Sequence, residues 1–184
     1  MKSVVVDASI AIKWVLQEPD SDVAHALLAK WIEEETVILA PVLLAYEITN
    51  GLYRKTLKGE LTFDKAKLGI RKILLTGLEL DFTEDPSFGI KAMELASQFN
   101  LAATYDSHYL ALAEREGCEL WTSDTKMGRA VRGKLNQVRY LEDFSKRGGH
   151  PRGATQEWHL TFNARGRIRP VVSMCCILIM LARR

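Results

Sequence analysis

Short runs of apolar, β-branched residues alternate along the chain with longer segments whose apolar residues recur at helical spacing. The strand-like runs lie at about Ser3 to Val6, Val37 to Ala40, Leu78 to Phe82, Glu119 to Thr122 and Val138 to Leu141. Helices are predicted between them, over about Ser9 to Leu16, Asp22 to Glu34, Leu43 to Leu57, Phe63 to Leu75, Pro86 to Phe99, Asp106 to Arg115 and Thr125 to Val131. Because strands that alternate with helices form βαβ units, this pattern predicts an α/β fold whose sheet is mostly parallel with helices on both faces.

The composition fits one globular domain followed by a different kind of segment. The chain has 184 residues, of which 47% are hydrophobic, enough for a single full core. At Gly148 the periodic pattern stops, and residues 148–184 carry a net charge of +5 against −3 for residues 1–147. We therefore expect a domain over residues 1–147 and a tail over residues 148–184 that is disordered or adventitious. The last apolar run of the tail, 12 residues long, is too short to span a bilayer.

The cysteines and the first residues bear on where the protein works. Cys118, Cys175 and Cys176 are odd in number and form no C-x-x-C pair, so neither a disulfide framework nor a zinc site is expected. The apolar run that ends before Asp7 is much shorter than the apolar core of a signal peptide. These features predict a cytoplasmic protein with no membrane partner.

Acidic residues follow the predicted strands at the positions where α/β proteins build their sites. Asp7 follows the first strand directly, Asp124 follows the strand that ends at Thr122, and Asp106 begins a helix. In a parallel sheet, sites form beside the carboxyl ends of the strands, where the strand order reverses. We therefore expect these three acids near one rim of the sheet, and Glu47 joins them if its helix packs across that rim.

Each acid taken alone has a simpler interpretation as a helix cap or turn former. That interpretation suits Asp106, which could cap its own helix, better than Asp7, because Ser9 could cap the helix that follows. It is weakest for the set, since four neighbouring carboxylates repel each other unless a cation offsets their charge. Carboxylate oxygens without His or Cys ligands favour a hard ion, Mg²⁺ or Mn²⁺. Such a site suits phosphoryl hydrolysis, because the metal activates a water molecule and stabilises the transition state.

Four segments together resemble the PIN-domain ribonucleases of the VapC toxin type. They are the run from Val4 through Asp7 to Trp14, the run from Pro41 through Glu47 to Leu52, the run from Tyr105 to Ala113, and Trp121 to Asp124. The resemblance covers residues 1–144 and rests on the order and spacing of all four segments. It implies a three-layer fold with a mostly parallel five-stranded sheet.

The resemblance also implies a function and a set of site residues. These are Mg²⁺- or Mn²⁺-dependent cleavage of RNA by a metal-activated water, with Asp7, Glu47, Asp106 and Asp124 as catalytic and metal-binding acids. Ser9, Asn50 and Thr122 match supporting positions. The VapC type implies a toxin that pairs with an antitoxin protein, and we expect a homodimer.

Other functions remain open at this point. A phosphatase of the haloacid dehalogenase type needs D-x-D, but Ser9 stands at the third position, and the acidic pair of a receiver domain is missing. A PIN fold that only binds a partner, or a housekeeping PIN nuclease without an antitoxin, are the closer alternatives. Lys13, Arg54, Lys55, Lys126, Arg129 and Arg132 flank the predicted rim, where they could bind RNA phosphates or serve as solvated surface charge.

Overall fold

A computed structural model of the chain describes residues 2–146, 159–162 and 168–171. Five strands form one sheet in which all neighbours are parallel, in the order β3-β2-β1-β4-β5. The strands are β1 (Ser3–Val6), β2 (Val37–Pro41), β3 (Glu79–Asp81), β4 (Glu119–Thr122) and β5 (Val138–Tyr140). The predicted α/β class and the five-stranded parallel sheet are therefore confirmed.

The strand order places β1 at the centre of the sheet. From β1 the chain moves outward to β2 and β3 on one side, and it later returns to the other side for β4 and β5. Val6, the last residue of β1, is in register with Trp121 of β4. The strand order therefore reverses between β1 and β4, and the crevice beyond their carboxyl ends is where this class of fold binds ligands.

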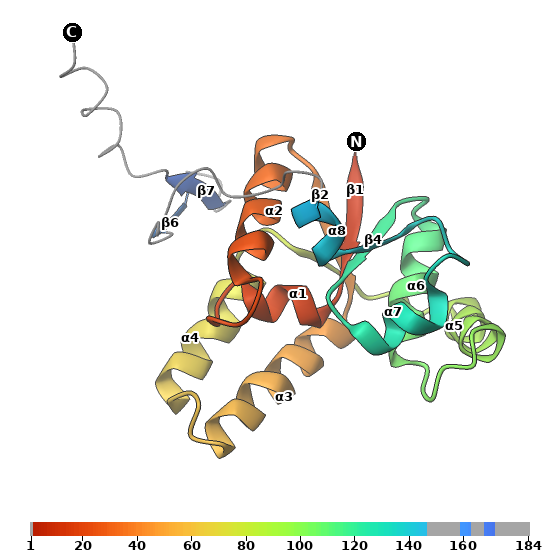
Figure 1. The fold of residues 1–184 in the computed structure, drawn as a ribbon, viewed down its shortest axis with the longest axis horizontal. Helices are drawn as coiled ribbons and strands as arrows, with labels where there is room; N and C mark the ends of the chain where they lie inside the picture. Colours follow the sequence, from red (N-terminus) through yellow and green to blue (C-terminus); the bar gives the residue numbers. More distant parts are fainter. Residues whose placement is uncertain (1, 147–158, 163–167, 172–184) are drawn as a thin grey trace, which may run out of the picture.

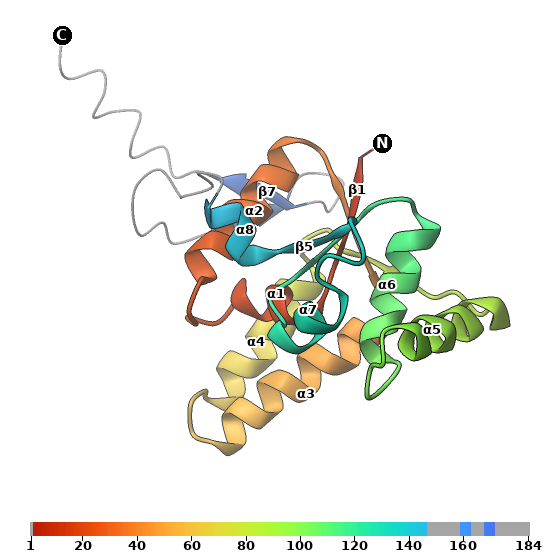
Figure 2. The ribbon, with the colours of Figure 1, turned by 45° about the vertical axis from the view of Figure 1, so that its right-hand side comes forward.

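Helices cover both faces of the sheet, which gives the three predicted layers. Their bounds are α1 (Ala8–Lys13), α2 (Ser21–Glu33), α3 (Leu43–Leu57), α4 (Phe63–Leu74), α5 (Pro86–Gln98), α6 (Tyr105–Arg115), α7 (Thr125–Val131) and α8 (Leu141–Lys146). Figures 1 and 2 show α1 to α4 grouped on one side of β1, with α5 and α6 on the other side. The helix α6 packs on β1, β2 and β4, and α5 packs on the outside of α6.

Local sequence signals explain most helix boundaries. The side chain of Thr62 accepts a hydrogen bond from the Lys65 amide and caps α4, and Asp85 caps α5 directly before Pro86. Gly59 follows the end of α3 with a φ of 72°, a left-handed conformation that glycine adopts without strain. The helix α1 ends at Lys13, three residues before the predicted Leu16, and the other predicted helix starts and ends lie within one residue of those observed.

The helix α8 is not predicted by the sequence pattern, and it begins at Leu141, where the predicted last strand ends. It is only six residues long, and it packs beside α2, where Phe144 makes an edge-on contact with Trp121 at 6.2 Å between ring centroids. Tertiary packing rather than a cap signal therefore accounts for this helix.

The predicted tail lies almost entirely outside the described residues, and its assignment stays a prediction. Within residues 148–184, the structure describes β6 (His159–Phe162) and β7 (Ile168–Val171), which pair as antiparallel strands. The prediction for Cys175 and Cys176 also lies outside the described residues, whereas Cys118 is a free thiol. Among the described helices, none has the length and apolar character needed to cross a bilayer.

Candidate active site

Asp7 lies directly after β1 and is almost completely buried, with 6% of its surface exposed. Its carboxylate accepts hydrogen bonds from the Ser9 hydroxyl at 2.6 Å, from the Ile10 amide at 3.2 Å and from the Thr122 hydroxyl. Its own amide donates to the Trp121 carbonyl, which continues the pairing of β1 with β4. The carboxylate is therefore held in one position at the centre of the sheet edge.

The two hydroxyl groups that hold Asp7 also connect it to the loop after β4. The Ser9 oxygen accepts a hydrogen bond from the Ser123 amide at 2.8 Å, and the Thr122 oxygen accepts one from the Asp124 amide at 2.9 Å. Each hydroxyl thus donates to Asp7 and accepts from the β4 loop. This network sets the position of Asp124 relative to Asp7, and it brings the predicted supporting residues Ser9 and Thr122 to the acids.

The expected division of capping roles is wrong. Asp7 itself caps α1 through the Ile10 amide, whereas Ser9 bonds to Asp7 and Ser123 instead of capping. Asp124 caps α7 by accepting from the amides that follow it, and Asp106 caps nothing. Capping and a role in the site are compatible, because an ionised carboxylate has about four acceptor sites and the hydrogen bonds to Asp7 fill three of them.

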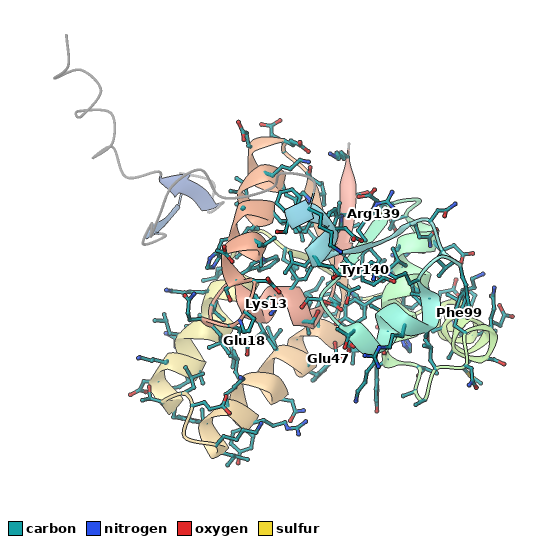
Figure 3. All side chains as sticks on the ribbon, viewed as in Figure 1. Lys13, Glu18, Glu47, Phe99, Arg139 and Tyr140 are labelled. Atoms are coloured by element: carbon teal, nitrogen blue, oxygen red, sulfur yellow. The ribbon has the colours of Figure 1, made fainter. Side chains whose placement is uncertain are left out.

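Glu47 reaches the site from the first part of α3, where Figure 3 shows it close to the sheet. Its carboxylate accepts a hydrogen bond from the hydroxyl of Tyr109, a residue of α6 that is 99% buried. Burial raises the pKa of the Glu47 carboxyl, and the charges of Asp106 and Asp124 raise it further. Tyr109 was absent from the predicted site, although it lies three residues after Asp106 and hence on the same face of a helix.

Electrostatic repulsion links all four acids. Burial raises the pKa of Asp7 from 3.8 to about 7, and the charge of Asp124 contributes to the rise. Asp106, which lies half-buried in the first turn of α6, has its pKa raised by burial and by Asp124. Burial and the neighbouring carboxylates of Glu47, Asp7 and Asp106 also raise the pKa of the Tyr109 hydroxyl, which keeps it a hydrogen-bond donor. The four carboxylates therefore share one poorly solvated region of negative charge.

Asn50 is the predicted supporting residue that the structure does not bring to the acids. Its side chain is exposed and lines an apolar groove with Tyr46 and Tyr53 of the same helix and Phe82 after β3. Glu47 instead points to Tyr109 of α6. A supporting role of Asn50 in the site therefore stays a prediction.

Basic side chains do not neutralise the acids. Among residues 2–146, no Lys, Arg or His lies in an ion pair with Asp7, Glu47, Asp106 or Asp124. Lys13 is buried and donates to the Pro19 carbonyl at 2.7 Å, near Glu18 (Figure 3), so it serves neither as solvated surface charge nor, in this arrangement, as a contact for RNA phosphates. The negative charge of the site is therefore left for a ligand to offset.

The donor atoms of the four acids are of the chemical type that hard divalent cations bind. Carboxylate oxygens, in a set without thiol or imidazole groups, are the donors that Mg²⁺ and Mn²⁺ prefer. Within the part of the chain that the structure describes, however, no three acidic, His or Cys side chains come close enough together to hold a metal ion as they stand. The acids thus form a region of the right chemistry rather than a preformed cage.

The fold and the site define an α/β protein with a cluster of acidic residues near the point where the strand order reverses. The family profile described as the PIN domain matches residues 4–133, most of the chain. The chain therefore belongs to the PIN domain family, whose members are generally nucleases.

Solved structures similar to this chain share its fold. PAE2754 from Pyrobaculum aerophilum is 23% identical with a TM-score of 0.57, over 79% of this chain and 96% of that one. VapBC2 from Rickettsia felis, solved with a DNA fragment of its promoter, is 17% identical with a TM-score of 0.53, over 75% and 98%. VapC20 from Mycobacterium tuberculosis, a toxin that cleaves the sarcin-ricin loop, is 16% identical with a TM-score of 0.56, over 74% and 98%. No protein in the curated set that was compared matches this chain.

Proposed function

We propose that this protein is a Mg²⁺- or Mn²⁺-dependent endoribonuclease and acts as the toxin of a toxin–antitoxin pair. The observation that carries the proposal is the buried Asp7 carboxylate, which is linked to Asp124 through the Thr122 hydroxyl and has no basic partner among the described residues. A fold that keeps such uncompensated charge at its ligand-binding crevice is suited to recruit a cation.

Asp7, Asp106, Asp124 and Glu47 are the residues that would hold the metal. A bound Mg²⁺ or Mn²⁺ would stabilise the charge that develops on the phosphate and favour attack by water. Ser9 and Thr122 keep Asp7 and Asp124 at a constant separation, and Tyr109 orients Glu47. Such prior positioning lowers the cost of arranging the acids around the reacting phosphate.

An antitoxin is the proposed protein partner. Support comes from the likeness in fold to VapBC2 and to a toxin–antitoxin complex from Klebsiella pneumoniae, which is 15% identical with a TM-score of 0.51. A homodimer is proposed for a separate reason: Tyr46, Tyr53 and Phe82 around the apolar groove are 69%, 50% and 67% exposed. An exposed apolar surface of this kind commonly marks a protein interface.

RNA cleavage by the purified protein tests the proposal. We expect cleavage of RNA in Mg²⁺ or Mn²⁺, none in EDTA, and at least a hundredfold loss in an Asp7→Asn variant. Asp64→Asn is the matched control, because Asp64 is an exposed acid on α4 whose partner is Lys67. A binding module without activity would cleave nothing, and a housekeeping nuclease would cleave RNA but bind no protein encoded next to it.

A further inference from the structure

A cavity adjoins the acidic site on the side of β5. It is a cavity of about 260 Å³ between the loop after β4, the helix α7 and the residues that follow β5. Its lining includes Thr122, Ser123 and Asp124, so it opens onto the same sheet edge as the acids. Whatever occupies this cavity therefore lies directly beside a ligand held by Asp7 and Asp124.

One wall of the cavity is flat and held in place. The guanidinium of Arg132 lies over the Tyr140 ring at 4.3 Å from the centroid, and Glu142 accepts a hydrogen bond from it. The Tyr140 hydroxyl donates to the Gly128 carbonyl at 3.1 Å, and the ring lies where a side chain at position 128 would stand. The wall is thus formed before any ligand arrives.

Arg129 is the basic residue of the lining that remains available. It is exposed on α7, and among the described residues it has no ion pair or hydrogen-bonded partner for its side chain. Arg132, in contrast, is occupied by Glu142 and Asp143. The guanidinium of Arg129 can therefore donate hydrogen bonds to a ligand in the cavity, and the exposed carboxylate of Asp20 can accept them.

This combination suits a nucleobase better than a phosphate. A phosphate offers only acceptors, whereas the lining mixes arginine donors with carboxylate and hydroxyl groups beside a flat wall. The volume is below the roughly 300–1,000 Å³ of pockets that take drug-sized molecules, so it suits one base. Arginine pairs best with the two acceptors on the edge of guanine.

We propose that this cavity binds the base of a nucleotide next to the scissile phosphate, with guanine preferred, and that Arg129 hydrogen-bonds to that base. The inference rests on the proposed function, because the acids define which phosphate is scissile. According to this inference, the cavity determines the sequence specificity of RNA cleavage.

Binding of guanosine 5′-monophosphate to the full chain in EDTA tests the cavity without cleavage or metal. In ¹H–¹⁵N NMR spectra we expect the largest shifts at the amides of Ser123, Gly128 and Arg129, with weaker binding of uridine 5′-monophosphate. Arg129→Ala should raise the Kd for the guanine nucleotide about tenfold, the usual cost of losing a charged hydrogen bond. The control is Lys72→Ala, an exposed cation on α4 outside the lining, which should change the Kd less than about twofold.

Sequencing the ends cut from a randomised RNA pool in Mg²⁺ gives the second measurement. We expect one position beside the cut to be enriched in guanine for the wild type and for Lys72→Ala, and to lose that enrichment in Arg129→Ala. Equal effects of the two variants, or shifts confined to other parts of the protein, would overturn the inference while leaving a cleaving wild type intact. Absence of any cleavage would instead contradict the proposed function, and the NMR comparison alone would then decide whether the cavity binds a base.

Discussion

The hydroxyl of Thr122 donates a hydrogen bond to the carboxylate of Asp7, although the two residues lie 115 positions apart in the sequence. The same oxygen accepts the amide of Asp124, so one buried side chain joins two of the acids. This link exists because the parallel pairing of β1 with β4 brings the carboxyl ends of both strands to one point.

Thr122→Val tests that link. Valine has nearly the same shape but removes the hydroxyl, so the Asp124 amide loses its acceptor and Asp7 loses a donor. We therefore expect the free energy of unfolding to fall by about 1–3 kcal/mol. RNA cleavage should fall at least tenfold, since Asp7 and Asp124 lose their fixed separation. Thr122→Ser keeps the hydroxyl and should retain most of the activity; equal activity of the serine and valine variants would contradict the bridging role. Chemical denaturation and cleavage rates measure both effects.

Tyr109→Phe removes the hydroxyl that holds Glu47 and keeps the buried ring. We expect the melting temperature to change little, while the Mn²⁺ concentration needed for half-maximal cleavage rises about 10- to 100-fold, as for other groups that orient metal ligands. Tyr105→Phe on the same helix removes an exposed hydroxyl and serves as the control. If both variants require the same Mn²⁺ concentration as the wild type, Tyr109 does not position Glu47.

The buried Asp7 makes the metal-free protein sensitive to pH. Its pKa is raised to about 7 in the folded state, mainly by burial, and is near 3.8 when unfolded, so the folded state binds the proton more tightly. Stability in EDTA should therefore decrease as pH rises from about 4 to 7 and then level off, with a loss of about 4 kcal/mol at most. Asp7→Asn should remove most of this dependence. If the free energy of unfolding of the wild type, relative to that of Asp7→Asn, does not fall between pH 4 and 7, the assignment is contradicted.

Gly128→Ala tests the wall of the cavity. A Cβ at position 128 would lie 2.8 Å from a carbon of the Tyr140 ring, so the ring must move, and we expect a destabilisation of about 1–3 kcal/mol. Gly89→Ala in α5 is the matched control, because its Cβ would meet nothing within 4 Å and alanine favours a helix. Thermal unfolding of the two variants gives the comparison, and equal stability of both would show that the ring is not held against Gly128.

Much of the fold could be predicted because its signals are local. Runs of β-branched residues, the caps Thr62 and Asp85, and the glycines after helices define where elements begin and end. The helix α8 could not be predicted because it is short and packs on α2 and β5, with Phe144 against Trp121, and these contacts exist only in the folded arrangement.

The sequence could predict the positions of site residues only where these residues follow the ends of adjacent strands. Asp7 and Asp124 follow adjacent parallel strands, so their proximity follows from topology. The bond between Tyr109 and Glu47 joins two helices, and no spacing along the chain indicates it. The role of Asn50 stays a prediction for the same reason, because positions on one helix do not show which neighbour each side chain meets.

Calorimetric titration of the metal-free protein with Mn²⁺ tests the central claim that the four acids form a metal site. We expect wild type and Asp64→Asn to bind Mn²⁺ with the same affinity, and Asp7→Asn to bind at least tenfold more weakly while keeping a cooperative unfolding transition. Absence of Mn²⁺ binding by the wild-type protein, or equal binding by the folded Asp7→Asn variant, would contradict the account.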